Sequence, residues 1–176
     1  NRMARDPHLP GPDFQPPLPA SIEAEQVVLG SLMVAKTGWD DVRPVLTGPS
    51  DFFEPVHQRI YAALDQANRE GRPADWRVVA GLFVDDPALS QLGRDKYLRS
   101  LAEAAQAVID VGQYARVVGE AAVKRRVIEA TNQIREKAFN GLAATELLST
   151  FKATADRIVD DGPAIDRVRA LFVSQW

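Results

Sequence analysis

Apolar residues recur along most of this chain at intervals of three and four positions, which is the spacing of one face of an α-helix. The clearest example begins at Asp51, in the segment DFFEPVHQRIYAALDQANREG. Its aligned positions are Phe53, Val56, Ile60 and Leu64, with Phe52 and Tyr61 beside them. No segment alternates with the period of two expected of a strand for long. The pattern therefore predicts an all-α fold.

Capping residues divide the first part of the chain into short helices. Ser21, Asp75 and Asp86 each precede a stretch of helical periodicity, as N-cap residues do. Glu23 and Glu25 follow Ser21 and would lie near the positive end of their helix. We expect residues 20–106 to form a compact head of about six short helices.

From Asp110 onward the pattern changes to two long helices. Asp110 and Gln113 have capping-box spacing, and no proline follows until Pro163. Helical periodicity continues to Asn140 and Gly141 and then resumes. Residues 107–161 are therefore expected to form a long antiparallel helical hairpin.

The apolar stripes of such a hairpin need more cover than its two helices give each other. A second copy of the same hairpin is the simplest partner, because a twofold contact lets one patch serve both chains. We therefore predict a homodimer through hairpins. The predicted interface consists of Tyr114, Val117, Ala121, Ile128, Ile134, Leu148, Phe151, Ala155 and Ile158.

Composition limits the remaining possibilities. The formal net charge is -3, and there are no cysteines. The chain should therefore not attract DNA with its whole surface, and it has no disulfides or thiolate metal sites. Because the sequence has no long apolar run, we expect the chain to make no membrane contact and to be cytoplasmic. Residues 1–19 hold half of the twelve prolines and are predicted to be a flexible tail, and residues 162–176 a linker start or a tail.

Four segments in order resemble the N-terminal domain of DnaB-type replicative DNA helicases. They are LPASIEAEQVVLGSLM at 18–33, DFFEPVHQRIYAAL at 51–64, GRPAD at 71–75 and YARVVGEAAVKRRVIEATNQI at 114–134. The resemblance implies a helical head and hairpins that pair into dimers, which assemble as a hexameric trimer of dimers. It also implies that this collar receives the primase and, in some systems, a helicase loader. The chain departs from the family at Gly93 and Arg94, where relatives tend to have two glycines, and in carrying Gly112 and Gly119.

The residues needed for catalysis are missing from this sequence. A phosphate-binding loop needs a glycine followed by Lys, and no glycine here has that neighbour. The chain alone is therefore not expected to be an enzyme or to hold a cofactor, whereas its full-length parent would be an ATP-dependent DNA helicase. His8 and His57 lack the Glu-x-x-His spacing of metal-binding bundles, so no metal site is expected.

His57 and five aromatic residues are read first as structural. His57 is predicted to be hydrogen-bonded near the surface, with a pH-sensitive contact as the alternative. The aromatic residues follow helical spacing within the head, which favours a core over a base-stacking platform. They are Trp39, Phe52, Phe53, Tyr61 and Trp76.

One basic cluster, Lys124, Arg125 and Arg126, is a candidate contact for single-stranded DNA or an acidic partner. Three consecutive helical residues span about 200° of arc, so they cannot all face one partner. The alternative is a solvated face with intrahelical pairs such as Arg125 with Glu129.

Three functions remain open. The first is an oligomerisation and primase- or loader-docking domain of a replicative helicase, without the ATPase motor. The second is a standalone collar-like protein that binds and regulates a helicase. Continuation of the gene into a Gly-Lys-Ser or Gly-Lys-Thr loop would favour the first function over the second. The third, a DNA-binding regulator, is disfavoured because the chain is acidic and shows no recognition helix.

Overall fold

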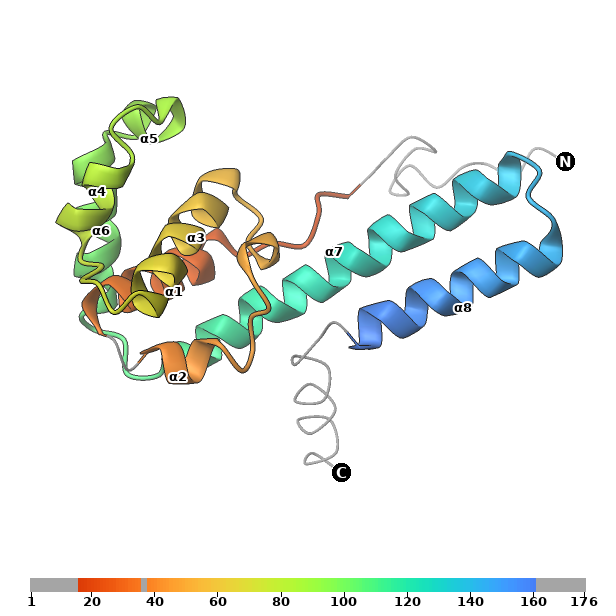
Figure 1. Cartoon of the computed structure of the whole chain (residues 1–176), viewed down its shortest axis with the longest axis horizontal. Coiled ribbons are helices and arrows are strands. Elements are labelled where there is room, and N and C mark those ends of the chain that lie inside the picture. The colour runs from red at the N-terminus through yellow and green to blue at the C-terminus, as the bar shows by residue number, and fades with distance from the viewer. Residues whose placement is uncertain (1–15, 36–37, 161–176) are drawn as a thin grey trace, which may run out of the picture.

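The computed structural model describes residues 16–35 and 38–160, which form a helical head and a projecting hairpin (Figure 1). The described part of the chain is helical and contains no strand, as predicted. The head contains α1 (Ile22–Val34), α2 (Gly38–Val42), the 3-10 helix η1 (Pro49–Asp51), α3 (Pro55–Arg69), α4 (Trp76–Leu82), α5 (Pro87–Gln91) and α6 (Arg94–Ala105). The hairpin is made by α7 (Val111–Phe139) and α8 (Ala144–Asp160).

Side-chain caps start four of these helices, as the sequence predicts. The Ser21 hydroxyl accepts a hydrogen bond from the amide of Ala24, and Asp75 accepts from the first turn of α4. Asp86 and Asp110 do the same for α5 and α7. These side-chain oxygens satisfy amides that have no partner within the helix.

The core is organised around α1, which packs against α6, α7 and α3. Gly30 allows the closest of these approaches, because a Cβ atom at this position would lie 2.0 Å from the carbonyl oxygen of Leu101 on α6. Val28 and Leu29, the two residues before Gly30 in α1, are fully buried. A glycine in the middle of α1 therefore sets the distance between two helices of the head.

The entry to α3 differs from the prediction in one respect. Phe53 was expected on the buried face, yet it precedes α3 and is partly exposed, whereas Phe52 is buried. Pro55 begins α3, so both phenylalanines precede the helix, and helical spacing does not decide which way Phe53 points. The rest of the predicted stripe is buried: Val56, Ile60 and Leu64.

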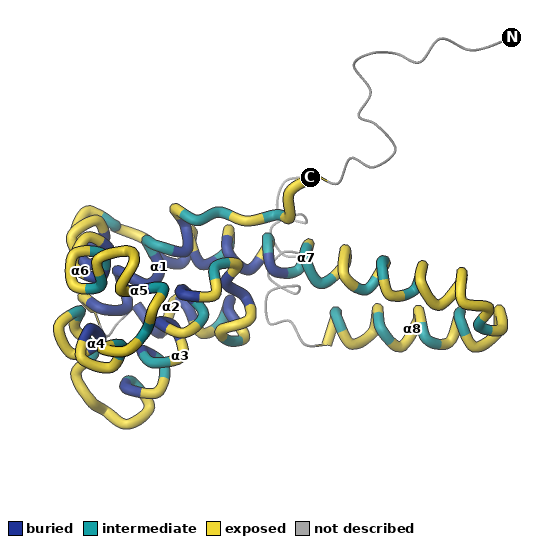
Figure 2. The backbone as a smooth tube through the Cα atoms, turned by 90° about the horizontal axis from the view of Figure 1, so that it is seen from above, coloured by how far each residue is buried: buried dark blue, intermediate teal, exposed yellow. Residues whose placement is uncertain are grey.

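The hairpin extends well beyond the head. Buried residues are confined to the head and the first half of α7, and the outer part of the hairpin is largely exposed (Figure 2). No residue of α8, all of which the structure describes, is buried. Asn140 and Gly141 end α7 as predicted, and Gly141 has a positive φ of 81°.

Several predictions concern residues that lie outside the described ranges. They are the flexible tail, apart from residues 16–19, and the segment 162–176. Within the described ranges, no helix combines the length and hydrophobicity that crossing a membrane requires.

Candidate protein–protein interface

The hairpin is rooted in the head through the first turns of α7. The side chains of Val111, Ala115, Val118 and Ala122 are buried and share one face of that helix. This face packs on α1 and α2. One face of the inner half of α7 is therefore part of the head's core, and the outer half projects beyond the head.

Two arginines fasten α7 to the head at the point where it leaves the core. Arg125 donates to the backbone carbonyls of Pro19 and Asp51, and its guanidinium lies over the ring of Phe53. Arg126 forms an ion pair with the carboxylate of Asp51. We refer to Asp51, Arg125 and Arg126 as the arginine latch. Burial lowers the pKa of Arg125, and Glu25 and Asp51 act in the opposite direction.

Asp51 is almost fully buried, and its charge is compensated on several sides. Its Oδ2 atom accepts hydrogen bonds from the amides of Thr47 and Gly48 and from the Thr47 hydroxyl. Oδ1 faces the guanidinium of Arg126. A buried carboxylate needs such partners, because an uncompensated charge in the interior is strongly unfavourable. The latch is therefore part of the folded structure of the head.

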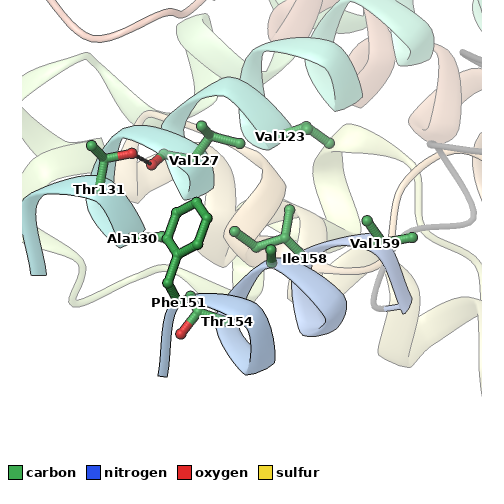
Figure 3. Close-up of a pocket in the computed structure, with 9 residues that line it drawn as sticks. Val123, Val127, Ala130, Thr131, Phe151, Thr154, Ile158 and Val159 are labelled. Atoms are coloured by element: carbon green, nitrogen blue, oxygen red, sulfur yellow. Dashed lines mark hydrogen bonds between the residues drawn. The ribbon is translucent and has the colours of Figure 1, made fainter. Parts of the chain in front are cut away.

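Beyond the latch, α7 and α8 enclose an apolar groove of about 320 Å³ (Figure 3). Phe151, Ile158 and Val159 line it from α8, and Val123 and Val127 line it from α7. The remaining lining residues are Ala130, Thr131, Thr154 and Ala155. The groove offers apolar contact and almost no hydrogen-bonding groups.

The predicted interface residues fall in four places. Phe151, Ala155 and Ile158 line the groove. Leu148 lies one turn closer to the hairpin tip and is 69% exposed, and Tyr114 and Val117 are exposed near the head. Ala121, Ile128 and Ile134 are exposed or half-buried positions of α7 that do not line the groove. The whole set remains a predicted interface.

The sequence-based set omits the α7 side of the groove. Val123 and Val127 line it but were not among the predicted interface residues. Together with Ala130 and Thr131 they have the spacing i, i+4, i+7 and i+8, which is one helical face. That periodicity was present in the sequence, but it occurs beside other apolar stripes of the same helix.

The structure places the basic cluster on two different sides of α7. Arg125 and Arg126 contact the head through the latch, and Arg125 bonds there rather than to Glu129. Lys124 is exposed and pairs with Glu120, 2.6 Å away on the preceding turn. Contact of this cluster with DNA or an acidic partner remains a prediction.

His57 is fully buried, which differs from its expected place near the surface. Its Nδ1 atom lies 2.7 Å from Oε2 of Glu25, and its Nε2 atom lies 2.6 Å from the Tyr97 hydroxyl. Glu25 also accepts hydrogen bonds from the amides of Phe53 and Glu54. This buried network connects α1, α3 and α6, so Glu25 is a structural anchor and not an exposed charge at a helix end.

The other aromatic residues divide between the core and its edge. Trp39 and Tyr61 are buried with Phe52, and Tyr61 packs against both rings. Trp76 is partly buried, and the guanidinium groups of Arg77 and Arg99 lie near its ring. Within the described residues, no group of three or more His, Cys, Asp or Glu side chains could hold a metal ion.

The matching family model is that of the DnaB-like helicase N terminal domain, which aligns with residues 17–120, more than half of the chain. The chain belongs to this family. Its DnaB-like N-terminal fold extends from the head into α7, so the matched region includes the buried root of the hairpin.

Curated and solved relatives agree with this assignment. Replicative DNA helicase DnaB of Mycobacterium leprae is 30% identical over 86% of this chain and 25% of that protein. The protein of the same name from Geobacillus stearothermophilus is 33% identical over 69% of this chain and 26% of that protein. The crystal structure of the N-terminal domain of DnaB helicase from Mycobacterium tuberculosis superposes with a TM-score of 0.72 at 32% identity, covering 82% of this chain and 99% of that one. The chain thus spans about a quarter of its curated relatives.

Proposed function

We propose that this chain is the N-terminal oligomerisation and docking domain of a replicative DNA helicase, and that its hairpin pairs with the hairpin of a second copy. The apolar groove between α7 and α8 carries the proposal. Phe151 is 55% exposed at this groove although it is a large apolar residue, and α8 has no buried residue at all. In water, such a surface gains free energy when a partner covers it.

A second copy suits this groove because it brings the same apolar helices to the contact. A twofold axis would place each α8 beside the other chain's groove, so that one surface is covered twice. In the family context, such dimers would assemble further into the hexameric ring of the helicase. The motor that hydrolyses ATP would belong to the full-length parent.

A single cysteine tests hairpin pairing directly, because the chain has none of its own. Ala130→Cys places a thiol in the groove, and any disulfide it forms must join two chains. We expect mild oxidation to convert this variant to a covalent dimer. Ala62→Cys, on the exposed side of α3, is the matched control and should remain largely monomeric.

The mass of the chain in solution gives an independent measurement. Light scattering over a concentration series should show a dimer for the parent chain and a monomer for Phe151→Asp. Leu82→Asp, which makes the same kind of change at an exposed position of α4, should behave as the parent. Circular dichroism would check that α8 remains helical in Phe151→Asp. A parent chain that stays monomeric at high concentration and fails to cross-link would contradict hairpin pairing.

Family membership also supports docking of the primase, and in some systems of a helicase loader, on the assembled collar. Binding of a purified primase to the parent chain, measured by calorimetry, would test this part separately. No measurable binding to the dimer would remove primase docking from the proposal and leave hairpin pairing unaffected.

Contact with single-stranded DNA is proposed for Lys124 rather than for the whole basic cluster. Arg125 and Arg126 hold the head together, so replacing all three residues would confuse folding with binding. Lys124→Glu should reduce salt-sensitive retention on single-stranded DNA by the assembled ring. Lys152→Glu is the control, since Lys152 is also exposed and paired one turn away on its helix. Equal retention by both variants and the parent would eliminate this contact.

A further inference from the structure

A hollow of about 640 Å³ lies on the head where the end of α1, the start of α4 and the second half of α6 meet. All of its lining residues belong to the described ranges, and none of them comes from α7 or α8. The lining includes Val34 of α1, Trp76 and Arg77 of α4, and Arg99 of α6. The hollow is therefore separate from the hairpin groove and contains charged and aromatic groups.

The indole of Trp76 lines this hollow together with two guanidinium groups. The Cζ atom of Arg77 lies 4.7 Å from the centroid of the indole, and that of Arg99 lies 5.8 Å from it. A guanidinium over an aromatic ring is held there by cation–π attraction, while its N–H donors remain at the edge of its own plane. Trp76 thus positions Arg77 without using its hydrogen-bond donors.

The acidic residues of the lining leave Arg77 without a counter-ion in the described part of the chain. Oδ1 of Asp75 accepts from the backbone amides of Arg77 and Val78, at 2.8 and 3.3 Å, and not from the guanidinium. Glu103 lies 3.3 Å from Arg99, and both side chains are more than half exposed. Such an exposed pair contributes little in water and can exchange partners. The Arg77 guanidinium is therefore available to a carboxylate from outside.

The same head contains a completed version of this arrangement. The guanidinium of Arg43 lies 5.1 Å from the centroid of the Trp39 ring, and its Nη2 atom is 3.2 Å from Oδ1 of Asp65. A carboxylate beside an indole-bound guanidinium is thus a geometry that this fold already uses. At Trp76 the corresponding carboxylate has to be supplied by another molecule.

An apolar wall lies beside the guanidinium groups. Val34 is 53% exposed at the end of α1 and lines the hollow, and the nearly buried side chains of Met33 and Ala102 line it as well. An aliphatic side chain placed against Val34 would remove apolar surface of both partners from water. A ligand that suits this hollow therefore combines a carboxylate with an aliphatic group.

Two other classes of ligand suit the lining less well. A nucleobase needs an uncovered aromatic face and a basic surface for its phosphates. The Trp76 ring already carries guanidinium groups, and the carboxylates of Asp75 and Glu103 lie in the same lining. A cationic ligand would be repelled by Arg77 and Arg99. The charges of the lining thus favour an acidic segment of a protein.

We propose that this hollow binds a segment of a partner protein in which Asp or Glu stands close to an aliphatic residue. The carboxylate would accept hydrogen bonds from Arg77, and the aliphatic side chain would pack against Val34 and the indole of Trp76. This inference rests on the proposed docking function. It does not depend on hairpin pairing, since no residue of the hairpin lines the hollow.

Selection from a displayed library of random short peptides tests the proposal without a known partner. The immobilised parent chain is the target, and Arg77→Gln, which removes the charge from the hollow, is used for counter-selection. We expect enriched peptides that carry Asp or Glu near Leu, Ile or Val. Failure to enrich any peptide that prefers the parent, or enrichment of basic peptides, would overturn the proposal.

The affinity of one enriched peptide then locates the site. Arg77→Gln should weaken binding by about tenfold or more, because the ion pair is lost. Arg43→Gln is the matched control, since Arg43 also lies over an indole but already has its carboxylate, and it should bind as the parent does. Equal binding by the two variants would show that the peptide sits at another surface.

The apolar half of the site has its own pair of variants. Val34→Asp places a negative charge on the apolar wall and should also weaken the peptide by about tenfold. Leu82→Asp makes the same kind of change at a position that is equally exposed but does not line the hollow, and should leave binding unchanged. Equal affinities for these two variants would contradict the proposed aliphatic contact.

The salt dependence of binding gives a readout that a merely structural role of Arg77 would not give. Added salt should weaken binding to the parent more than binding to Arg77→Gln, because salt screens the ion pair. Arg77→Lys keeps the charge but lacks the planar donors, so it should recover part of the affinity that Arg77→Gln loses. The same salt dependence in parent and Arg77→Gln would contradict the proposed ion pair.

The competing occupants are single-stranded nucleic acid and a second copy of this chain. Binding of a labelled oligothymidylate that is lost in Arg77→Gln would assign the hollow to nucleic acid and overturn the partner proposed here. A lower mass of Arg77→Gln than of the parent in light scattering would assign it to a second copy and overturn it equally. Hairpin cross-linking through Ala130→Cys is measured separately, so failure of one proposal is not mistaken for failure of the other.

Discussion

The imidazole of His57 lies 2.7 Å from the carboxylate of Glu25, and each of these side chains is 1% exposed. Glu25 and His57 come from α1 and α3, and Tyr97 of α6 completes the network on the other side of the ring. Three helices of the head therefore meet at one buried polar cluster. Buried polar networks of this kind stabilise a fold only when every member has a partner.

Replacing His57 should therefore destabilise the head strongly. His57→Ala leaves the Glu25 carboxylate buried without its imidazole partner, and we expect a loss of about 3 to 5 kcal/mol in the free energy of unfolding. Tyr97→Phe removes one neutral hydroxyl from the same network and should cost about 1 to 2 kcal/mol. Denaturant unfolding monitored by circular dichroism measures both. A smaller loss for His57→Ala than for Tyr97→Phe would show that Glu25 does not depend on His57.

Gly30→Ala tests the close contact between α1 and α6. The added Cβ atom would lie 2.0 Å from the backbone oxygen of Leu101, so the helices must separate. We expect a loss of about 3 kcal/mol or more, because backbone cannot move aside as a side chain can. Gly81→Ala is the control, since a Cβ atom at that position of α4 meets nothing within 4 Å. It should stabilise the chain by about 0.5 to 1 kcal/mol in thermal or denaturant unfolding.

The arginine latch can be tested with a double-mutant cycle. Arg126→Ala leaves Asp51 with only its hydrogen bonds from Thr47 and Gly48, and should cost about 2 to 3 kcal/mol. In the background of Asp51→Asn, the same change should cost much less, because the carboxylate charge is already gone. Arg135→Ala, an exposed change farther along α7, should alter stability by about 0.5 kcal/mol at most. Additive effects of Arg126→Ala and Asp51→Asn would contradict an energetic link between them.

Tyr61 makes stability depend on pH in the alkaline range. Its burial, followed by the charges of Asp65 and Asp51, raises the pKa of its phenol to about 12. In the unfolded chain the phenol loses its proton at a pH of about 10. Unfolding therefore releases a proton at pH values between about 10 and about 12. Tyr61 therefore stabilises the fold fully below about pH 10, and this contribution decreases as the pH rises toward about 12.

The measurement compares the parent chain with Tyr61→Phe. The free energy of unfolding of the parent should fall more steeply with alkaline pH than that of Tyr61→Phe, which has no phenol to ionise. Ultraviolet absorbance of the phenolate gives an independent titration of the folded chain. Parallel pH profiles for the two proteins would show that Tyr61 ionises normally in the fold.

Features that depend on neighbouring residues could be predicted from the sequence. The caps at Ser21, Asp75, Asp86 and Asp110 are local, and the structure contains all four. The burial of Glu25 could not be predicted in this way, because its partner His57 is 32 residues away. A carboxylate in the first turn of a helix is normally assigned to solvent, and only the packing of α3 against α1 reverses that expectation.

The candidate interface was predictable on one helix and not on the other. The apolar residues of α8 follow one face, so Phe151, Ala155 and Ile158 could be chosen from their spacing. In α7, apolar residues occur on several sides, because the inner turns are buried in the head while the outer turns face α8. Periodicity alone does not say which of these stripes meets which neighbour, and Val123 and Val127 were missed for this reason.

The continuity of α7 has a mechanical consequence. From Arg126 in the latch to Phe139 at its end, the helix is about 20 Å long at 1.5 Å per residue. A small rotation of α7 about the latch would therefore produce a larger displacement at the hairpin tip. A tilt of about 10° there would shift the hairpin tip by about 3 to 4 Å, so small adjustments around Asp51 would be amplified in the width of any ring that these hairpins build.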